Sequence, residues 1–166
     1  MEIHHYEKLW LIASMLLIVG FIATITYGAV GLGIAMVDDS GDVIDPDSVD
    51  QEEPFDEPRV EQVGENEYDA YVVARSFVFQ PDPIEVPEGS TVNFYVTSPD
   101  VIHGFQLAGT NVNTMVIPGE VAEITVEFDE PGEYGIVCNE YCGAGHHDME
   151  GELIVVPEEE YEGGDD

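Results

Sequence analysis

The sequence has very few basic residues. It contains only three Lys and Arg, namely Lys8, Arg59 and Arg75, against 36 Asp and Glu, and its formal net charge is -33 at pH 7. Because nucleic-acid binding depends on basic side chains that neutralise phosphates, this composition excludes nucleic acid as a partner. The acidic residues extend from residue 38 to the C-terminus, so the charge is not confined to one patch.

Two interpretations fit this acidic balance. It is either a patch for a basic partner or a surface adapted to concentrated salt, where repulsion between like charges is screened. A local patch does not require the loss of almost every lysine, so we favour the second and expect a haloarchaeal source. At molar salt the Debye length is only about 3 Å. Partners would then recognise the chain through close-range apolar and hydrogen-bonded contacts.

Cysteine is also scarce. Cys138 and Cys142 are the only two, and the haem attachment motif C-x-x-C-H is absent. Both lie in the stretch VCNEYCGAGHHDMEG, residues 137–151, which also contains His146 and Met149. A disulfide, a zinc site and a copper site are the three alternatives for this arrangement.

The three alternatives make different demands on the residues. A disulfide between cysteines so close in sequence gains little from cross-linking and leaves the imidazole and the thioether unexplained, although an oxidising compartment would allow it. Zinc accepts thiolates and imidazoles but does not call for a thioether. Copper uses thiolate, imidazole and a weak methionine together, and two cysteines suggest two coppers that share bridging thiolates.

One long segment has no charge at all. Residues 10–37 contain no Asp, Glu, Lys or Arg, and about 20 apolar residues in a helix are enough to span a membrane. We therefore expect residues 1–37 to form an N-terminal segment with one transmembrane helix in contact with membrane lipid. Lys8 precedes this run and no Lys or Arg follows until Arg59, so the positive-inside rule predicts a cytoplasmic N-terminus.

The remaining chain divides by composition. Residues 38–69 are almost half acidic and lack apolar periodicity, which predicts an extended linker, and residues 158–166 are predicted to be an acidic tail. Between them, residues 70–157 contain short runs rich in Val, Ile, Thr and aromatic residues, separated by Pro and Gly. This pattern predicts an all-β sandwich. The expected strands are 70–79, 91–98, 121–128, 133–138 and 152–156.

The motifs identify a family resemblance. The sequence CNEYCGAGHHDM at 138–149, with VIHGF at 101–105, closely resembles the CuA domain of subunit II of haem-copper oxidases. The similarity extends to residues 78–89, 108–113 and 117–120, and the single apolar segment is similar to the one-helix subunit II of B-type, ba3-like oxidases. The resemblance implies a cupredoxin-like Greek-key sandwich outside the cell membrane.

The resemblance also implies a set of ligands and a function. Cys138 and Cys142 would bridge two coppers, His103 and His146 would each bind one, and Met149 and the backbone carbonyl of Glu140 would be weak ligands. The binuclear centre would accept electrons from a c-type cytochrome or a small blue-copper protein. It would pass them to haem in oxidase subunit I, where oxygen is reduced.

The main alternative is a membrane-anchored mononuclear copper carrier that works without an oxidase, although it leaves the second cysteine unexplained. Residues near the motifs also have open roles. Asp100 either orients His103 or caps the turn at 98–100.

We expect four further residues near the motifs to lie outside the ligand set. Phe77, Phe79 and Met115 are expected to pack in the core rather than to serve the metal. His147 is expected on the surface, because the C-x3-H spacing assigns the ligand to the histidine before it.

Overall fold

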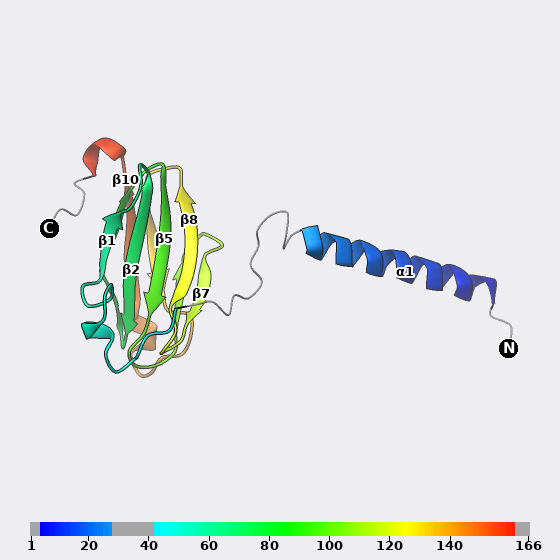
Figure 1. The fold of residues 1–166 in the computed structure, drawn as a ribbon, viewed down its shortest axis with the longest axis horizontal. Helices are drawn as coiled ribbons and strands as arrows, with labels where there is room; N and C mark the ends of the chain where they lie inside the picture. Colours follow the sequence, from blue (N-terminus) through cyan, green and yellow to red (C-terminus); the bar gives the residue numbers. More distant parts are fainter. Residues whose placement is uncertain (1–3, 28–41, 162–166) are drawn as a thin grey trace. The chain divides into compact units, whose positions relative to one another are not determined.

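The structure is a computed structural model that describes residues 4–27 and 42–161, in two compact units (Figure 1). The first unit contains helix α1, His5–Thr26. Its 22 residues measure about 33 Å at the rise of an α-helix, close to the thickness of a bilayer's hydrocarbon core. None of its residues is buried, so its length and composition fit a single membrane span. The predicted segment's residues 28–37 lie outside the described residues.

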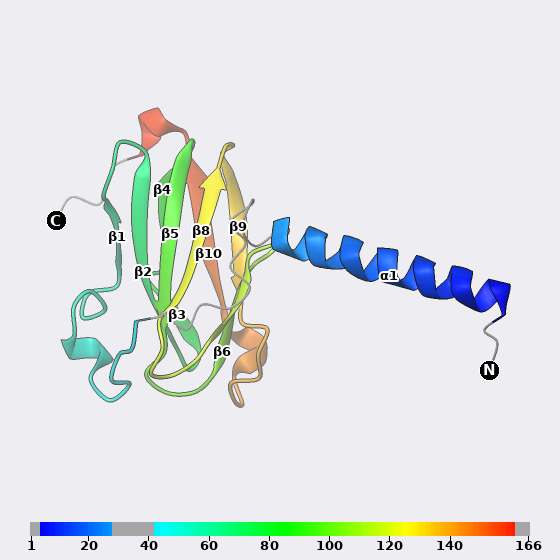
Figure 2. The same ribbon diagram turned by 45° about the vertical axis from the view of Figure 1, so that its right-hand side comes forward.

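The second unit is a sandwich of two five-stranded sheets (Figures 1 and 2). The first sheet has the order β1-β2-β5-β8, with β3 paired to β2, and the second has the order β4-β10-β9-β6-β7. The strands are β1 Arg59–Gln62, β2 Glu67–Arg75, β3 Val78–Gln80, β4 Ile84–Pro87, β5 Ser90–Thr97, β6 His103–Leu107, β7 Asn113–Val116, β8 Ala122–Phe128, β9 Gly132–Val137 and β10 Glu150–Val156. The predicted β-sandwich is confirmed.

Aromatic side chains join the two sheets. Phe105 of β6 and Phe94 of β5 are completely buried, with ring centroids 5.6 Å apart. Phe79 of β3 packs edge-on against Phe105 at 5.8 Å, which confirms the predicted core position of Phe79. Burial of such large apolar side chains is the main driving force for packing one sheet on the other.

The structure differs from the linker predicted for residues 38–69. Strand β1 and the start of β2 lie in this range, and the short helix η2 spans Val49–Gln51. Ile44, Val49 and Phe55 are buried against the outer face of the first sheet. The prediction of an extended linker was wrong for residues 42–69. Ile44, Val49 and Phe55 gave no signal in the sequence, because they are isolated among acidic residues and show no strand or helix period.

The predicted acidic tail is also more ordered at its start than expected. A short helix η4 spans Glu158–Glu160, and the ring of Tyr161 contacts the ring of Tyr68 edge-on at 5.6 Å. Tyr161 thus packs against the hydrophobic core, and this contact holds the start of the acidic tail on the sandwich. Residues 162–166 of the tail lie outside the described residues.

Candidate metal centre

The predicted donor residues come from two segments at one end of the sandwich (Figure 2). His103 is the first residue of β6, and the other donors lie in the loop from Cys138 to Met149 between β9 and β10. These two strands are antiparallel neighbours that pair Val137 with Glu150, so the loop starts and ends at adjacent positions. The Cys138 backbone N–H donates to the Met149 carbonyl at 3.2 Å and closes the base of the loop.

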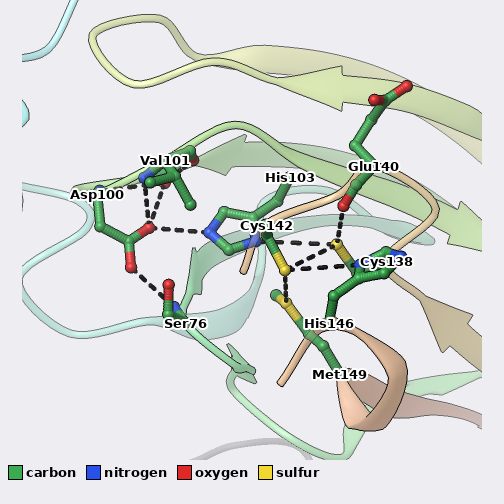
Figure 3. A network of polar contacts seen from close by, with 10 residues as sticks. Ser76, Asp100, Val101, His103, Cys138, Glu140, Cys142, His146 and Met149 are labelled. Carbon is green, nitrogen blue, oxygen red and sulfur yellow. Dashed lines mark hydrogen bonds and ion pairs between the residues drawn. The ribbon is translucent and has the colours of Figure 1, made fainter. Parts of the chain in front are cut away.

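Four donor groups lie close to the two cysteine sulfurs, which are themselves the other two donors (Figure 3). The Sγ atoms of Cys138 and Cys142 are 3.7 Å apart. His103 Nδ1 lies 3.8 Å from Cys138 Sγ, and His146 Nδ1 lies 3.7 Å from Cys142 Sγ. The Met149 thioether sulfur is 3.6 Å from Cys142 Sγ, and the Glu140 carbonyl oxygen is 3.2 Å from Cys138 Sγ. The structure thus brings together all the residues of the predicted ligand set.

The site is enclosed on most sides. His103, Cys138, Cys142 and Met149 are buried, whereas His146 is half-buried. The His146 ring contacts the ring of Tyr141 at 5.8 Å, and Tyr141 is 78% exposed. Of the two imidazoles, that of His146 is therefore the closer to solvent.

The two cysteines are free thiols and not a disulfide. Their separation of 3.7 Å is well beyond the roughly 2.05 Å of a sulfur–sulfur bond. Burial, followed by the hydrogen bond with Cys138, raises the pKa of the Cys142 thiol to about 11. A metal cation is the kind of partner that makes two buried thiolates stable, because it supplies the missing positive charge.

The donor set fits copper better than zinc. His103, Cys138 and Cys142 offer ligand atoms within 4.8 Å of one another, which either metal would accept. The Met149 sulfur and the Glu140 carbonyl lie against the same two thiols, and weak thioether and carbonyl ligands are typical of copper sites.

Asp100 has both of the roles considered from the sequence. Its Oδ1 lies 2.8 Å from His103 Nε2, which leaves Nδ1 facing the thiols, and its Oδ2 accepts the Ser76 backbone N–H at 2.8 Å. It also caps its own turn, because its Oδ1 accepts the Val101 N–H and the Ser98 hydroxyl. Burial alone would raise the pKa of Asp100, but the hydrogen bonds from His103 and Ser76 hold it below its usual range.

Met115 is not where the sequence suggested, whereas Phe77 packs against the core, as predicted, and also contacts the donor loop. Met115 was expected in the core but is 47% exposed on β7, where it pairs with Gly104, so that prediction was wrong. Phe77 is partly buried, and its ring faces the loop that carries the donors: a Cβ atom built on Gly145 would lie 2.4 Å from Phe77 Cδ2. No local sequence signal indicates this contact, because the two residues are far apart in the chain.

His147 lies on the surface, as predicted. Its Nε2 is 3.1 Å from Asp148 Oδ2, and both side chains are largely exposed. His146, not His147, is the histidine that faces the thiols.

Comparison with known proteins agrees with these observations. Residues 60–157 match the family described as cytochrome c oxidase subunit II, periplasmic domain. Cytochrome c oxidase subunit 2 of Thermus thermophilus is 47% identical over 154 residues, which cover 90% of this chain and 91% of that protein. Heme-copper oxidase subunit 2 of Aeropyrum pernix is 37% identical over 93 residues, which cover 55% of this chain and 40% of that protein.

Two solved structures extend the comparison. A chain of a heme-copper terminal oxidase dimer is 37% identical with a TM-score of 0.71, and the match covers 91% of this chain and 99% of that one. The periplasmic domain of subunit II from Bradyrhizobium japonicum is 23% identical with a TM-score of 0.52, covering 55% of this chain and 86% of that one. The second likeness confirms the cupredoxin-like fold alone.

The fold, the cluster of thiols and imidazoles and the extent of these matches lead to one assignment. The chain belongs to the cytochrome c oxidase subunit II family and is part of a haem-copper terminal oxidase.

Proposed function

We propose that this chain holds a binuclear CuA centre and that the centre transfers electrons from an external carrier to the haem-containing subunit I. The observation that carries the proposal is that two imidazole Nδ1 atoms, a thioether sulfur and a carbonyl oxygen lie within 3.2–3.8 Å of two adjacent, buried thiols. A mononuclear copper site needs one thiolate, so it leaves the second buried thiol without a role.

Each donor residue has a distinct part in holding the copper. Cys138 and Cys142 would bridge both ions and neutralise part of their charge. His103 and His146 would each bind one ion through Nδ1, while Met149 and the Glu140 carbonyl would be weak ligands. A bound copper pair supplies reversible one-electron transfer. The strands fix both ends of the ligand loop, which limits rearrangement of the ligands when the charge changes.

The placement in the membrane follows from the helix and its flanking charge. Helix α1 fits a single membrane span, and Lys8 is the basic residue near its N-terminal end. We propose that the N-terminus lies in the cytoplasm and that the copper-binding unit lies on the outer face of the cell membrane. Subunit I and lipid would then contact the helix.

Copper loading tests the proposal directly. The full chain in detergent, reconstituted with copper, is expected to bind about two ions per chain and to show a seven-line electron paramagnetic resonance spectrum, because one unpaired electron is shared by two coppers. A Met115→Leu variant serves as the control, since Met115 is an exposed methionine outside the cluster. One copper with a four-line spectrum would favour the mononuclear carrier, and no bound copper would contradict both.

The rim of the site indicates how an electron carrier docks. Val101, Ile102, Val137 and Tyr141 are each at least 40% exposed, and each lies within two residues of a donor. Such an apolar rim would bind a c-type cytochrome or a small blue-copper protein by contacts that salt does not screen.

We expect the second-order rate constant for reduction of the centre by its electron carrier to change less than about threefold between 0.5 M and 3 M salt, because apolar contacts are not screened. Tyr141→Ser is expected to lower this rate constant at both concentrations, whereas Val63→Ser, an exposed apolar residue just before β2, serves as the control. The measurement is the second-order rate of centre reduction in stopped flow. A steep fall in this rate constant with rising salt would contradict apolar docking. The adaptation of the whole acidic surface to concentrated salt stays a prediction.

A further inference from the structure

We propose that residues 42–56, here called the strap, position the metal centre through the turn between β2 and β3. This inference rests on the proposed function only in assuming that the donor cluster holds metal. The strap lies at the same end of the sandwich as the donor loop in both ribbon views (Figures 1 and 2). Three sets of contacts connect the strap to the donors.

The first set fastens the strap to the first sheet. Val49 and Phe55 are 1% and 4% exposed and pack, with Ile44, against the completely buried Val73 of β2. Backbone hydrogen bonds add to this packing: the Ile44 N–H donates to the Gly119 carbonyl at 3.3 Å, and the Val121 N–H donates to the Asp42 carbonyl at 2.9 Å. The strap therefore covers the last part of β2.

The second set connects the strap to the end of β2. Asp50 forms an ion pair with the guanidinium of Arg75, the last residue of that strand. The Arg75 Nε atom is buried and has no hydrogen-bond partner among the residues that the structure describes. Asp50 thus pairs with a half-buried cation at the end of β2. Because the Asp50 side chain is 64% exposed, water can replace part of this contact, and its loss should loosen the strand end less than loss of the apolar packing.

The third set connects the turn to both halves of the donor cluster. β2 and β3 pair Arg75 with Val78, which leaves Ser76 and Phe77 as the turn. The Ser76 N–H donates to Asp100 Oδ2 at 2.8 Å, and Asp100 Oδ1 lies 2.8 Å from His103 Nε2 (Figure 3). Hydrogen bonds in this position fix the orientation of a ligating imidazole.

The same turn also contacts the loop that carries Cys142 and His146. Cβ atoms built on Gly143 and Gly145 would lie 3.2 Å and 2.4 Å from atoms of the Phe77 ring. Glycine at these positions allows the ring to lie directly on the loop backbone. A shift of the turn would therefore disturb the His103 side and the His146 side of the site together.

The test uses the full chain in detergent with the variant Val49→Asp, which places a charge in the packed contact and releases the strap. We expect copper loss to a chelator to become at least about tenfold faster, as for the removal of supporting contacts around a metal site. We also expect altered copper hyperfine splitting in the loaded chain, which a general loss of stability would not produce. Asp47→Asn is the matched control, since Asp47 is an exposed carboxylate of the same strap.

A second readout works without copper and separates this inference from the proposed function. Cys138 and Cys142 are 3% and 6% exposed, so in the metal-free chain they are expected to react slowly with a thiol reagent. Release of the strap should accelerate labelling several-fold at temperatures well below unfolding. If Val49→Asp prevents folding, Asp50→Asn replaces it, with a smaller expected acceleration in the same direction.

One combination of results would overturn the positioning role of the strap. Hydrogen exchange of the strap amides reports whether the strap has detached. If it has detached while labelling, copper loss and hyperfine splitting all match those of Asp47→Asn, the strap does not position the site. If wild-type chain binds no copper but the labelling difference is present, the proposed function fails and the positioning role stands.

Discussion

Cys142→Ser is expected to lower bound copper from about two ions per chain to one or none, and to lower oxidase turnover by at least about 100-fold. That factor is the upper end of what the loss of a supporting contact costs, and the loss of a ligand should exceed it. Cys142 Sγ lies next to three other donors, at 3.6 Å from Met149 Sδ and 3.7 Å from both Cys138 Sγ and His146 Nδ1. A serine hydroxyl is a harder and less easily ionised donor.

The measurement combines metal analysis with electron paramagnetic resonance of the variant and turnover of the assembled oxidase. Cys138→Ser should behave in the same way, because Cys138 lies between His103 and the Glu140 carbonyl as Cys142 lies between His146 and Met149. Met115→Leu again provides the control. A Cys142→Ser chain that retained two coppers and a seven-line spectrum would exclude bridging by both thiolates.

The second large effect concerns the scaffold. Phe105→Ala is expected to lower the free energy of unfolding by about 3–5 kcal/mol, the usual cost of truncating a buried phenylalanine. Phe105 is completely buried, contacts Phe79 and Phe94 of the opposite sheet, and lies two residues after His103. The cavity would therefore open between the sheets beside a metal donor. Because domains are stable by only about 5–15 kcal/mol, this loss is a large share of the total.

Denaturant unfolding of the metal-free chain measures this effect. Val78→Ala, at a position that is 48% exposed on β3, is the control and should change the stability by less than about 0.5 kcal/mol. Phe105→Leu keeps most of the apolar volume and should fall between the two. Equal stabilities of Phe105→Ala and Val78→Ala would show that the two sheets do not depend on this aromatic contact.

Much of the site could be predicted from the sequence because most of its donors lie in one short segment. Cys138, Cys142, His146 and Met149 are spaced within a single loop, and that loop lies between two runs with strand composition. His103 is 35 residues away from Cys138 in sequence. Residue chemistry alone left the disulfide, zinc and copper alternatives open, and His103 entered the site through the family resemblance.

Other parts of the protein could not be predicted because their environment is made by distant residues. The strap contains too few apolar residues to show a period, and Ile44, Val49 and Phe55 become buried only because the outer face of β2 offers Val73. Met115 has the side chain of a core residue but lies on the exposed side of β7.

The sequence by itself determined the long apolar helix, the β-sandwich and the chemistry of the donor loop, because these depend on local composition, period and spacing. Only the tertiary structure decided which groups support the donors. Ser76 bonds Asp100, Asp100 bonds His103, and Phe77 lies against Gly145. These contacts form because the turn between β2 and β3, the loop before β6 and the loop between β9 and β10 lie at the same end of the sandwich. Such contacts depend on the pairing of strands across long distances in the chain, which no local pattern records.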